Sequence, residues 1–177
     1  MTDEKTKANL VRSKLIEDIK KVFKKDQRRI EHALAVLNYA EHIQAAEGGN
    51  LLVVRAGAIL HDIGIHEAER KYGSSSGKYQ ELEGPPIARK ILVPYDLGKD
   101  VVEHICRIIA NHHSAKHIDT AEFRIVWDAD WMVNIPVEFP DAGREKLQEI
   151  IDKVFKTRRG HQIAVESLTT ETATIEK

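Results

Sequence analysis

The chain has 177 residues, enough for one domain with a hydrophobic core and too few for two domains of ordinary size. Its 27 Lys and Arg residues nearly balance its 28 Asp and Glu residues, which argues against a broadly basic surface for nucleic acid. A single cysteine, Cys106, excludes an internal disulfide, and no apolar run approaches the roughly 20 residues that span a bilayer. The first residues do not resemble a targeting peptide, so we expect a cytoplasmic protein without a membrane or nucleic-acid partner.

Apolar residues recur at helical spacing through the first third of the chain. They predict helices over residues 5–25, 26–47 and 51–63, with Gly48 and Gly49 ending the second. The third is apolar on nearly every side, which indicates a central, buried helix.

A group of basic residues lies where the first predicted helix meets the second. One interpretation is that this group steers a phosphorylated substrate to the protein. Acidic residues are interleaved with it, however, and such a cluster is more often the solvent-exposed face of a helix. The group comprises Lys20, Lys21, Lys24, Lys25, Arg28 and Arg29.

The middle of the chain opens with a polar segment, residues 66–83, rich in Gly and Ser around position 75. We expect a mobile loop here, of the kind that forms lids or binding loops. Gly84, Pro85 and Pro86 are expected to open the fourth helix, because proline is tolerated in a first helical turn.

Three further helices are predicted over residues 98–113, 121–135 and from about Pro140 onward. No strand alternation or internal repeat is present. The sequence therefore predicts an all-α protein, a single compact bundle of about six to seven helices. Residues 1–160 would form the domain and residues 161–177 a partly flexible C-terminal tail.

Polar side chains that need partners fall at the ends or on the inward faces of these helices. His32 shares an inward stripe with apolar residues, and the His61-Asp62 pair ends the buried third helix. Burying an imidazole and a carboxylate is costly unless something satisfies them. A divalent first-row metal ion does so, because both groups are good ligands for it.

Four ordered motifs on a helical chain resemble the HD superfamily of metal-dependent phosphohydrolases. Leu60-His61-Asp62-Ile63-Gly64 carries the His-Asp pair. The resemblance spans about residues 26–134, and its other motifs are residues 29–32, ending in His32, residues 108–113 and residues 128–131.

The resemblance implies that His32, His61, Asp62 and an aspartate of the sixth helix bind one metal ion. Two acids compete for the last place. Residues 129–134, Ala-Asp-Trp-Met-Val-Asn, match the Ala-Asp-x-x-x-Asn pattern of related guanosine tetraphosphate hydrolases, which favours Asp130. Asp128 would then be a surface acid or lie outside the ligand shell.

The implied activity is metal-dependent hydrolysis of a small phosphorylated substrate, a nucleotide or another phosphate ester, by a metal-activated water. The ligand set fits Mn, Fe, Co, Ni or Zn. Asp62 is the candidate general base, and His112 and Glu83 are further candidate catalytic residues. Some relatives use extra histidines to bind a second metal ion. The presence of His112 and His113 leaves a second metal ion possible here.

Two alternatives come from the same resemblance. A few HD proteins hold two irons and oxygenate their substrates, so one alternative is a di-iron oxygenase. The other alternative is a non-catalytic HD domain that binds and senses a ligand. The sequence contains every expected ligand, which argues mildly against a degenerate, non-catalytic copy. It leaves the substrate, the metal and the oligomeric state open.

Overall fold

The computed structural model describes residues 2–169, and this part of the chain is helical without strands, which confirms the all-α prediction. It contains nine α-helices and one short 3-10 helix, more than the six to seven expected. They are α1 (Thr2–Phe23), α2 (Gln27–Glu47), α3 (Leu51–Leu60), α4 (Ile65–Tyr72), α5 (Gly77–Leu92), η1 (Val93–Tyr95), α6 (Lys99–Ile109), α7 (Ala121–Glu138), α8 (Arg144–Val154) and α9 (Arg158–Leu168).

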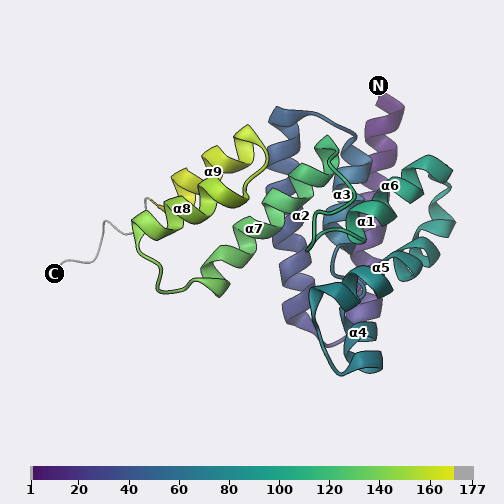
Figure 1. The fold of residues 1–177 in the computed structure, drawn as a ribbon. Helices are drawn as coiled ribbons and strands as arrows, with labels where there is room; N and C mark the ends of the chain where they lie inside the picture. Colours follow the sequence, from purple (N-terminus) through teal and green to yellow (C-terminus); the bar gives the residue numbers. More distant parts are fainter. Residues whose placement is uncertain (1, 170–177) are drawn as a thin grey trace.

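Helix α3 is the centre of the larger core, as its sequence predicts. It packs against α1, α2, α6 and α7 (Figure 1). The Asn50 side chain caps its first turn by accepting hydrogen bonds from the backbone N–H groups of Leu52 (3.0 Å) and Val53 (3.2 Å). The helix is buried on almost every side, so the residues that follow its last turn emerge inside the molecule.

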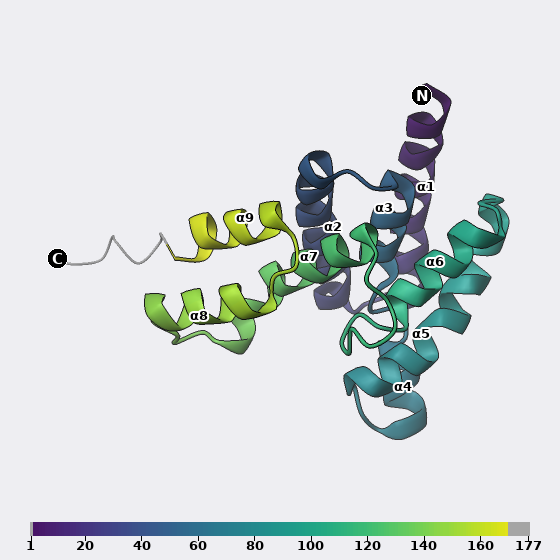
Figure 2. The ribbon, with the colours of Figure 1, turned by 45° about the horizontal axis from the view of Figure 1, so that its top comes forward.

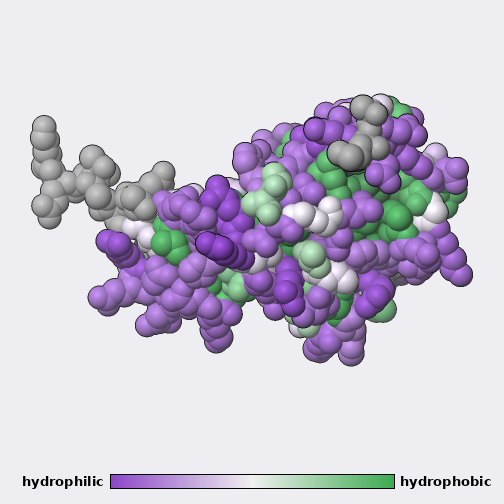
Figure 3. All heavy atoms as spheres, turned by 90° about the horizontal axis from the view of Figure 1, so that it is seen from above, coloured by the Kyte–Doolittle hydropathy of each residue, from purple (hydrophilic) through white to green (hydrophobic). Residues whose placement is uncertain are grey.

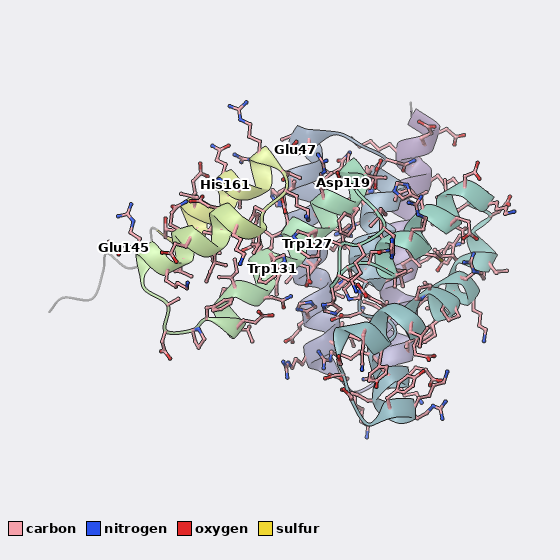
Figure 4. The ribbon with its side chains drawn as sticks, viewed as in Figure 1. Glu47, Asp119, Trp127, Trp131, Glu145 and His161 are labelled. Atoms are coloured by element: carbon pink, nitrogen blue, oxygen red, sulfur yellow. The ribbon has the colours of Figure 1, made fainter. Side chains whose placement is uncertain are left out.

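A second, smaller core joins α7 to the C-terminal helices. Figures 1 and 2 both show α8 and α9 as a pair beside α7, on the side away from α4, α5 and α6. Trp127 and Trp131 come from α7, close to this pair (Figure 4), and the indole N–H of Trp127 donates to the carbonyl of Val154 at 2.9 Å. The Glu47 carboxylate accepts from the backbone N–H of Arg159 at 2.7 Å, which ties the end of α2 to the start of α9.

The prediction of a mobile loop over residues 66–83 is wrong. Helix α4 fills its first part, with Ile65 and Ala68 buried, and Gly73, in the left-handed region at φ 62°, ends that helix. The Gly-Ser run falls in the connection over residues 73–76 and ends at Gly77, the first residue of α5. The polar composition therefore conceals a short helix, a tight turn and the first turns of the 16-residue helix α5.

The prolines at positions 85 and 86 lie inside α5 and do not open it, because the helix already begins at Gly77. They remove two backbone donors, so the carbonyls of Glu81 and Leu82 lose their usual partners. The side chain of Leu82 is 59% exposed, which gives water access to this side of the helix. The early start brings Gln80 and Glu83 into helical structure.

The sequence predicted a partly flexible C-terminal tail over residues 161–177. Within this range, residues 161–168 belong to α9. Residues 170–177 lie outside the described residues. Helix α7 runs to Glu138, three residues beyond its predicted end at residue 135, with Pro136 inside it.

Seen from above, the surface is mostly hydrophilic, with an apolar area around the beginning of α1 (Figure 3). Leu51, Leu97 and Val101 line a depression in this region. No helix in the described ranges is both long enough and apolar enough to cross a membrane.

Two glycines let α5 approach the turn that follows α3. A Cβ placed on Gly64 would lie 2.5 Å from the backbone nitrogen of Gly84 and 2.7 Å from the carbonyl oxygen of Gln80. Both neighbours are main chain, so neither can yield by a change of rotamer. The contact holds the end of the His61-Asp62 turn against α5.

Replacing Gly64 with alanine is expected to destabilise the protein by about 1–3 kcal/mol, the usual range for overpacking a core. Gly143→Ala is the matched control, because its φ is −68° and nothing lies within 4 Å of the added Cβ. Its free energy of unfolding should stay within about 0.5 kcal/mol of the wild type. Urea unfolding measures both, and equal midpoints for the two variants would contradict the close-contact interpretation.

Candidate metal centre

The residues predicted as metal ligands meet at one place, although they come from three different helical regions. His61 and Asp62 form the turn after α3 and are 0% and 9% exposed. His32 lies on the inner face of α2, and Asp130 lies on the facing side of α7, which packs directly against α2. Folding therefore brings together four candidate ligands that are too far apart in the sequence for a local motif to connect them.

The ligand atoms of these residues converge within a few ångströms. The Nε2 atoms of His32 and His61 are 3.1 Å apart, and Asp130 Oδ1 lies 3.1 Å from His32 Nε2. Asp62 Oδ2 is 3.5 Å from His61 Nε2 and 3.7 Å from His32 Nε2. The donor atoms of His32, His61 and Asp62 all lie within 4.8 Å of one another, a spacing that could hold one metal ion.

Backbone carbonyls orient two of the imidazole rings. The Nδ1–H of His61 donates to the carbonyl of Ala58 at 2.8 Å, and the Nδ1–H of His112 donates to that of Ile109 at 2.7 Å. When the ring is neutral, this tautomer leaves Nε2 with a free lone pair, the form that coordinates metals. The Nε2 of His112 is buried and has no hydrogen-bond partner within the described ranges.

Asp62 lies between two groups of histidines. While its Oδ2 faces His32 and His61, its Oδ1 lies 3.4 Å from His112 Nε2. Asp62, His112 and His113 form a second cluster whose donor atoms lie within 4.8 Å of one another. One carboxylate is thus shared by two potential cation sites.

The electrostatics of the group favour a positive charge at its centre. Burial disfavours the charged His61 ring, but the carboxylates of Asp62 and Asp130 outweigh it and raise its pKa to about 9. Burial would raise the pKa of Asp62, yet the adjacent His61 and His112 hold that pKa well below its usual range. A bound cation would take the place of the proton on His61.

Asp128 is not at the surface, as one of the alternatives expected, but fully buried. It accepts hydrogen bonds from the backbone N–H groups of Lys156 (2.8 Å) and Thr157 (2.7 Å) and from the Thr157 hydroxyl (2.7 Å). Burial nevertheless raises the pKa of Asp128 to about 6. Of the two competing acids, Asp130 is the one placed beside the histidines.

Glu83, a candidate catalytic residue, has both carboxylate oxygens engaged by residues of α4. Lys71 Nζ lies 2.6 Å from one oxygen, and the Tyr72 hydroxyl donates to the other at 2.8 Å. These hydrogen bonds lower the pKa of Glu83. The four candidate ligands His32, His61, Asp62 and Asp130 form the candidate metal cluster. Glu83 does not line the cavity that opens beside this cluster, and it holds α4 against α5.

A cavity of about 510 Å³ opens next to the cluster, between α2 and α7. The sequence offered no signal for several of its lining residues. Gln80 is one of them: its Nε2 donates to the carbonyl of Ser75 at 2.8 Å, and its buried Oε1 has no hydrogen-bond partner in the part of the chain described. The lining comprises Arg28, Arg29, Glu31, His32, Ala35, Asp62, Gln80, His113, Asp130, Val133, Asn134, Val137 and Glu138.

Comparison with known proteins gives the family. The model of the HD domain matches residues 29–135, more than half of the chain and the same region that carries the His and Asp cluster. The chain belongs to the HD-domain family.

Two relatives add to this assignment. An HD-superfamily hydrolase from Bacillus thuringiensis superposes with a TM-score of 0.63, covering 89% of this chain and 88% of its own, at 20% identity, so it supports the HD fold. Ribonuclease Y of Rubrobacter xylanophilus is 25% identical over 131 residues, 72% of this chain. The chain spans only 22% of the length of that ribonuclease.

Asp128 and Asp130 should behave oppositely when each is replaced by alanine. Asp128→Ala leaves three donors at the α8–α9 turn without an acceptor, so we expect a loss of about 3 kcal/mol in the free energy of unfolding with metal content per folded chain unchanged. Asp130→Ala should instead lower metal content. Chemical unfolding and elemental analysis of Mn²⁺-loaded protein measure the two effects, and loss of metal in Asp128→Ala alone would reverse the assignment.

Proposed function

We propose that this HD protein is a metal-dependent phosphohydrolase that acts on a nucleotide or another small phosphate ester. The observation that carries the proposal is the convergence of His32, His61, Asp62 and Asp130 at the end of an open cavity. The family assignment and the hydrolase with the same fold support hydrolysis as the reaction.

The donor set fits the divalent ion that the family implies. Two imidazole nitrogens and two carboxylates suit Mn, Fe, Co, Ni or Zn, and the tautomer fixed at His61 presents a lone pair to the ion. When bound, the ion would lower the pKa of a water molecule and polarise a phosphoryl oxygen.

The chain's own residues would position the reactants and move the proton. Asp62 has one oxygen toward the His32–His61 side and the other toward His112, so it can accept a proton from a water held between them. His112 Nε2, with its free lone pair, would accept a proton next or hold a second metal ion together with His113. Asn134 donates to Asp130 Oδ1 at 2.9 Å and fixes that carboxylate.

The similarity to Ribonuclease Y supports including phosphodiesters among the substrates to be tested. In both ester classes the attacked atom is phosphorus, and the leaving group is an oxygen. The same water-positioning carboxylate would therefore serve either reaction.

Purified protein supplied in turn with Mn²⁺, Co²⁺, Ni²⁺ or Zn²⁺ is expected to hydrolyse at least one member of a panel of p-nitrophenyl phosphate, nucleoside phosphates and short RNA. Asp62→Asn should lower kcat by about 100-fold or more, because an amide cannot accept the proton. Asp100→Asn, an exposed acid at the start of α6, is the control and should retain full activity.

Elemental analysis of the same preparations separates the alternatives. About one divalent metal per wild-type chain and little in Asp62→Ala is expected, and two metals would favour a second ion at Asp62, His112 and His113. Two irons with oxygen-dependent turnover would favour the oxygenase instead. Metal binding without turnover of any ester would favour a ligand-sensing domain and contradict the proposal.

A further inference from the structure

The cavity beside the metal cluster is much larger than a single phosphoryl group. Its volume of about 510 Å³ falls in the range of roughly 300–1,000 Å³ that holds whole small-molecule ligands. His32, Asp62 and Asp130 occupy only one part of its lining. The rest of the lining must therefore contact parts of the ligand other than the reacting phosphate.

Two arginines lie in this lining one helical turn before His32. Arg28 and Arg29 precede His32 by four and three residues, so all three side chains project from neighbouring positions on one side of α2. One turn advances the helix by about 5.4 Å. The guanidinium groups are thus placed to reach an anion about one turn away from the metal cluster.

Neither arginine is neutralised by a close acid. Within residues 2–169, the Arg28 side chain has no ion-pair or hydrogen-bond partner, and Arg29 has only a 3.8 Å contact with the half-exposed Glu69. Arg107, Arg144, Arg158 and Arg159 also lack a carboxylate partner for their side chains among residues 2–169, but they do not line this cavity. Five other arginines are engaged by carboxylates at hydrogen-bonding distance. They are Arg12, Arg55, Arg70, Arg89 and Arg124.

The lining also contains two acids, Glu31 on α2 and Glu138 at the end of α7. Glu31 precedes His32 by one residue, so its carboxylate would repel an anion near the metal side of the cavity, and Glu138 would do the same on α7. Ala35, Val133 and Val137 provide an apolar strip, on which an uncharged part of the ligand can lie. The cavity therefore has a metal cluster, an apolar strip and a cationic end.

We infer that the substrate carries a second anionic group, a phosphate that is not hydrolysed, and that Arg28 and Arg29 bind it. The inference rests on the proposed hydrolysis at the metal cluster and adds the substrate class: a doubly phosphorylated ester whose two phosphates lie about one helical turn apart. Arginine suits this role because its planar fork of donors binds phosphate through two hydrogen bonds at once.

A binding experiment that needs no turnover tests this. Methylphosphonate and a bisphosphonate with a three-carbon bridge would be titrated by calorimetry into Mn²⁺-loaded wild type, Arg28→Gln and Arg29→Gln. We expect the bisphosphonate to bind wild type at least tenfold more tightly than methylphosphonate. Each variant should bind the bisphosphonate about tenfold more weakly, because it loses a hydrogen bond to a charged group. Its affinity for methylphosphonate should stay the same.

Two charge-matched controls separate direct contact from long-range attraction. Lys25→Gln removes an exposed cation next to α2 but outside the cavity lining, and Lys90→Gln removes one on the outer side of α5. Both should leave the ratio of the two affinities unchanged. The inference would be overturned if Arg28→Gln and Arg29→Gln lost affinity for both phosphonates equally. It would also be overturned if Lys25→Gln lost as much bisphosphonate affinity as the arginine variants.

The result is independent of catalysis. If wild type hydrolyses none of the esters but Arg28→Gln still loses the bisphosphonate preference, the anion site stands and the hydrolase proposal fails. If esters are hydrolysed while wild type binds both phosphonates equally, the arginine site fails alone. With active enzyme, Arg28→Gln should raise KM for a doubly phosphorylated nucleotide about tenfold more than it raises KM for p-nitrophenyl phosphate.

Discussion

The structure depends on how two buried carboxylates are compensated. Asp62 and Asp130 lie beside the same pair of imidazoles, and each negative charge disfavours the other. Taking such groups out of water costs several kcal/mol per ion unless opposite charge and hydrogen bonds surround them. The fixed ring of His61 and the amide of Asn134 meet part of that requirement, and the cluster could hold a cation that would meet the rest. The helices around α3 are arranged so that all of these groups reach one point.

Much of this was accessible from the sequence because it depends on local patterns. The apolar spacing located α2, α3 and α7, and Gly48 and Gly49 marked where α2 ends. The His61-Asp62 pair at the end of the most apolar helix predicted a buried polar site. The resemblance to one family added His32 and Asp130, which no spacing rule connects.

What the sequence did not predict follows from contacts between distant segments. Composition hid α4, because its polar surface residues outnumber the two apolar ones that pack inward. Prolines inside α5 favour a helix start, but burial of Gly84 against Ile109 and Gly64 fixes the helix across them. The exposure of Asp128 could not be judged, since its partners Lys156 and Thr157 lie in a turn far along the chain.

Asp128 and Asp130 stand two residues apart on α7 and therefore point to nearly opposite sides of the helix. Asp128 is fixed to the turn before α9, and a Cβ on Gly160, in the first turn of α9, would lie 2.5 Å from its Oδ2. Asp130 lies beside His32 in the candidate metal cluster. The C-terminal pair of helices thus holds the side of α7 that faces away from Asp130, while α2 packs against the side that carries it. Because the two anchors face apart, the contacts that hold α8 and α9 are separate from those that bring Asp130 to His32.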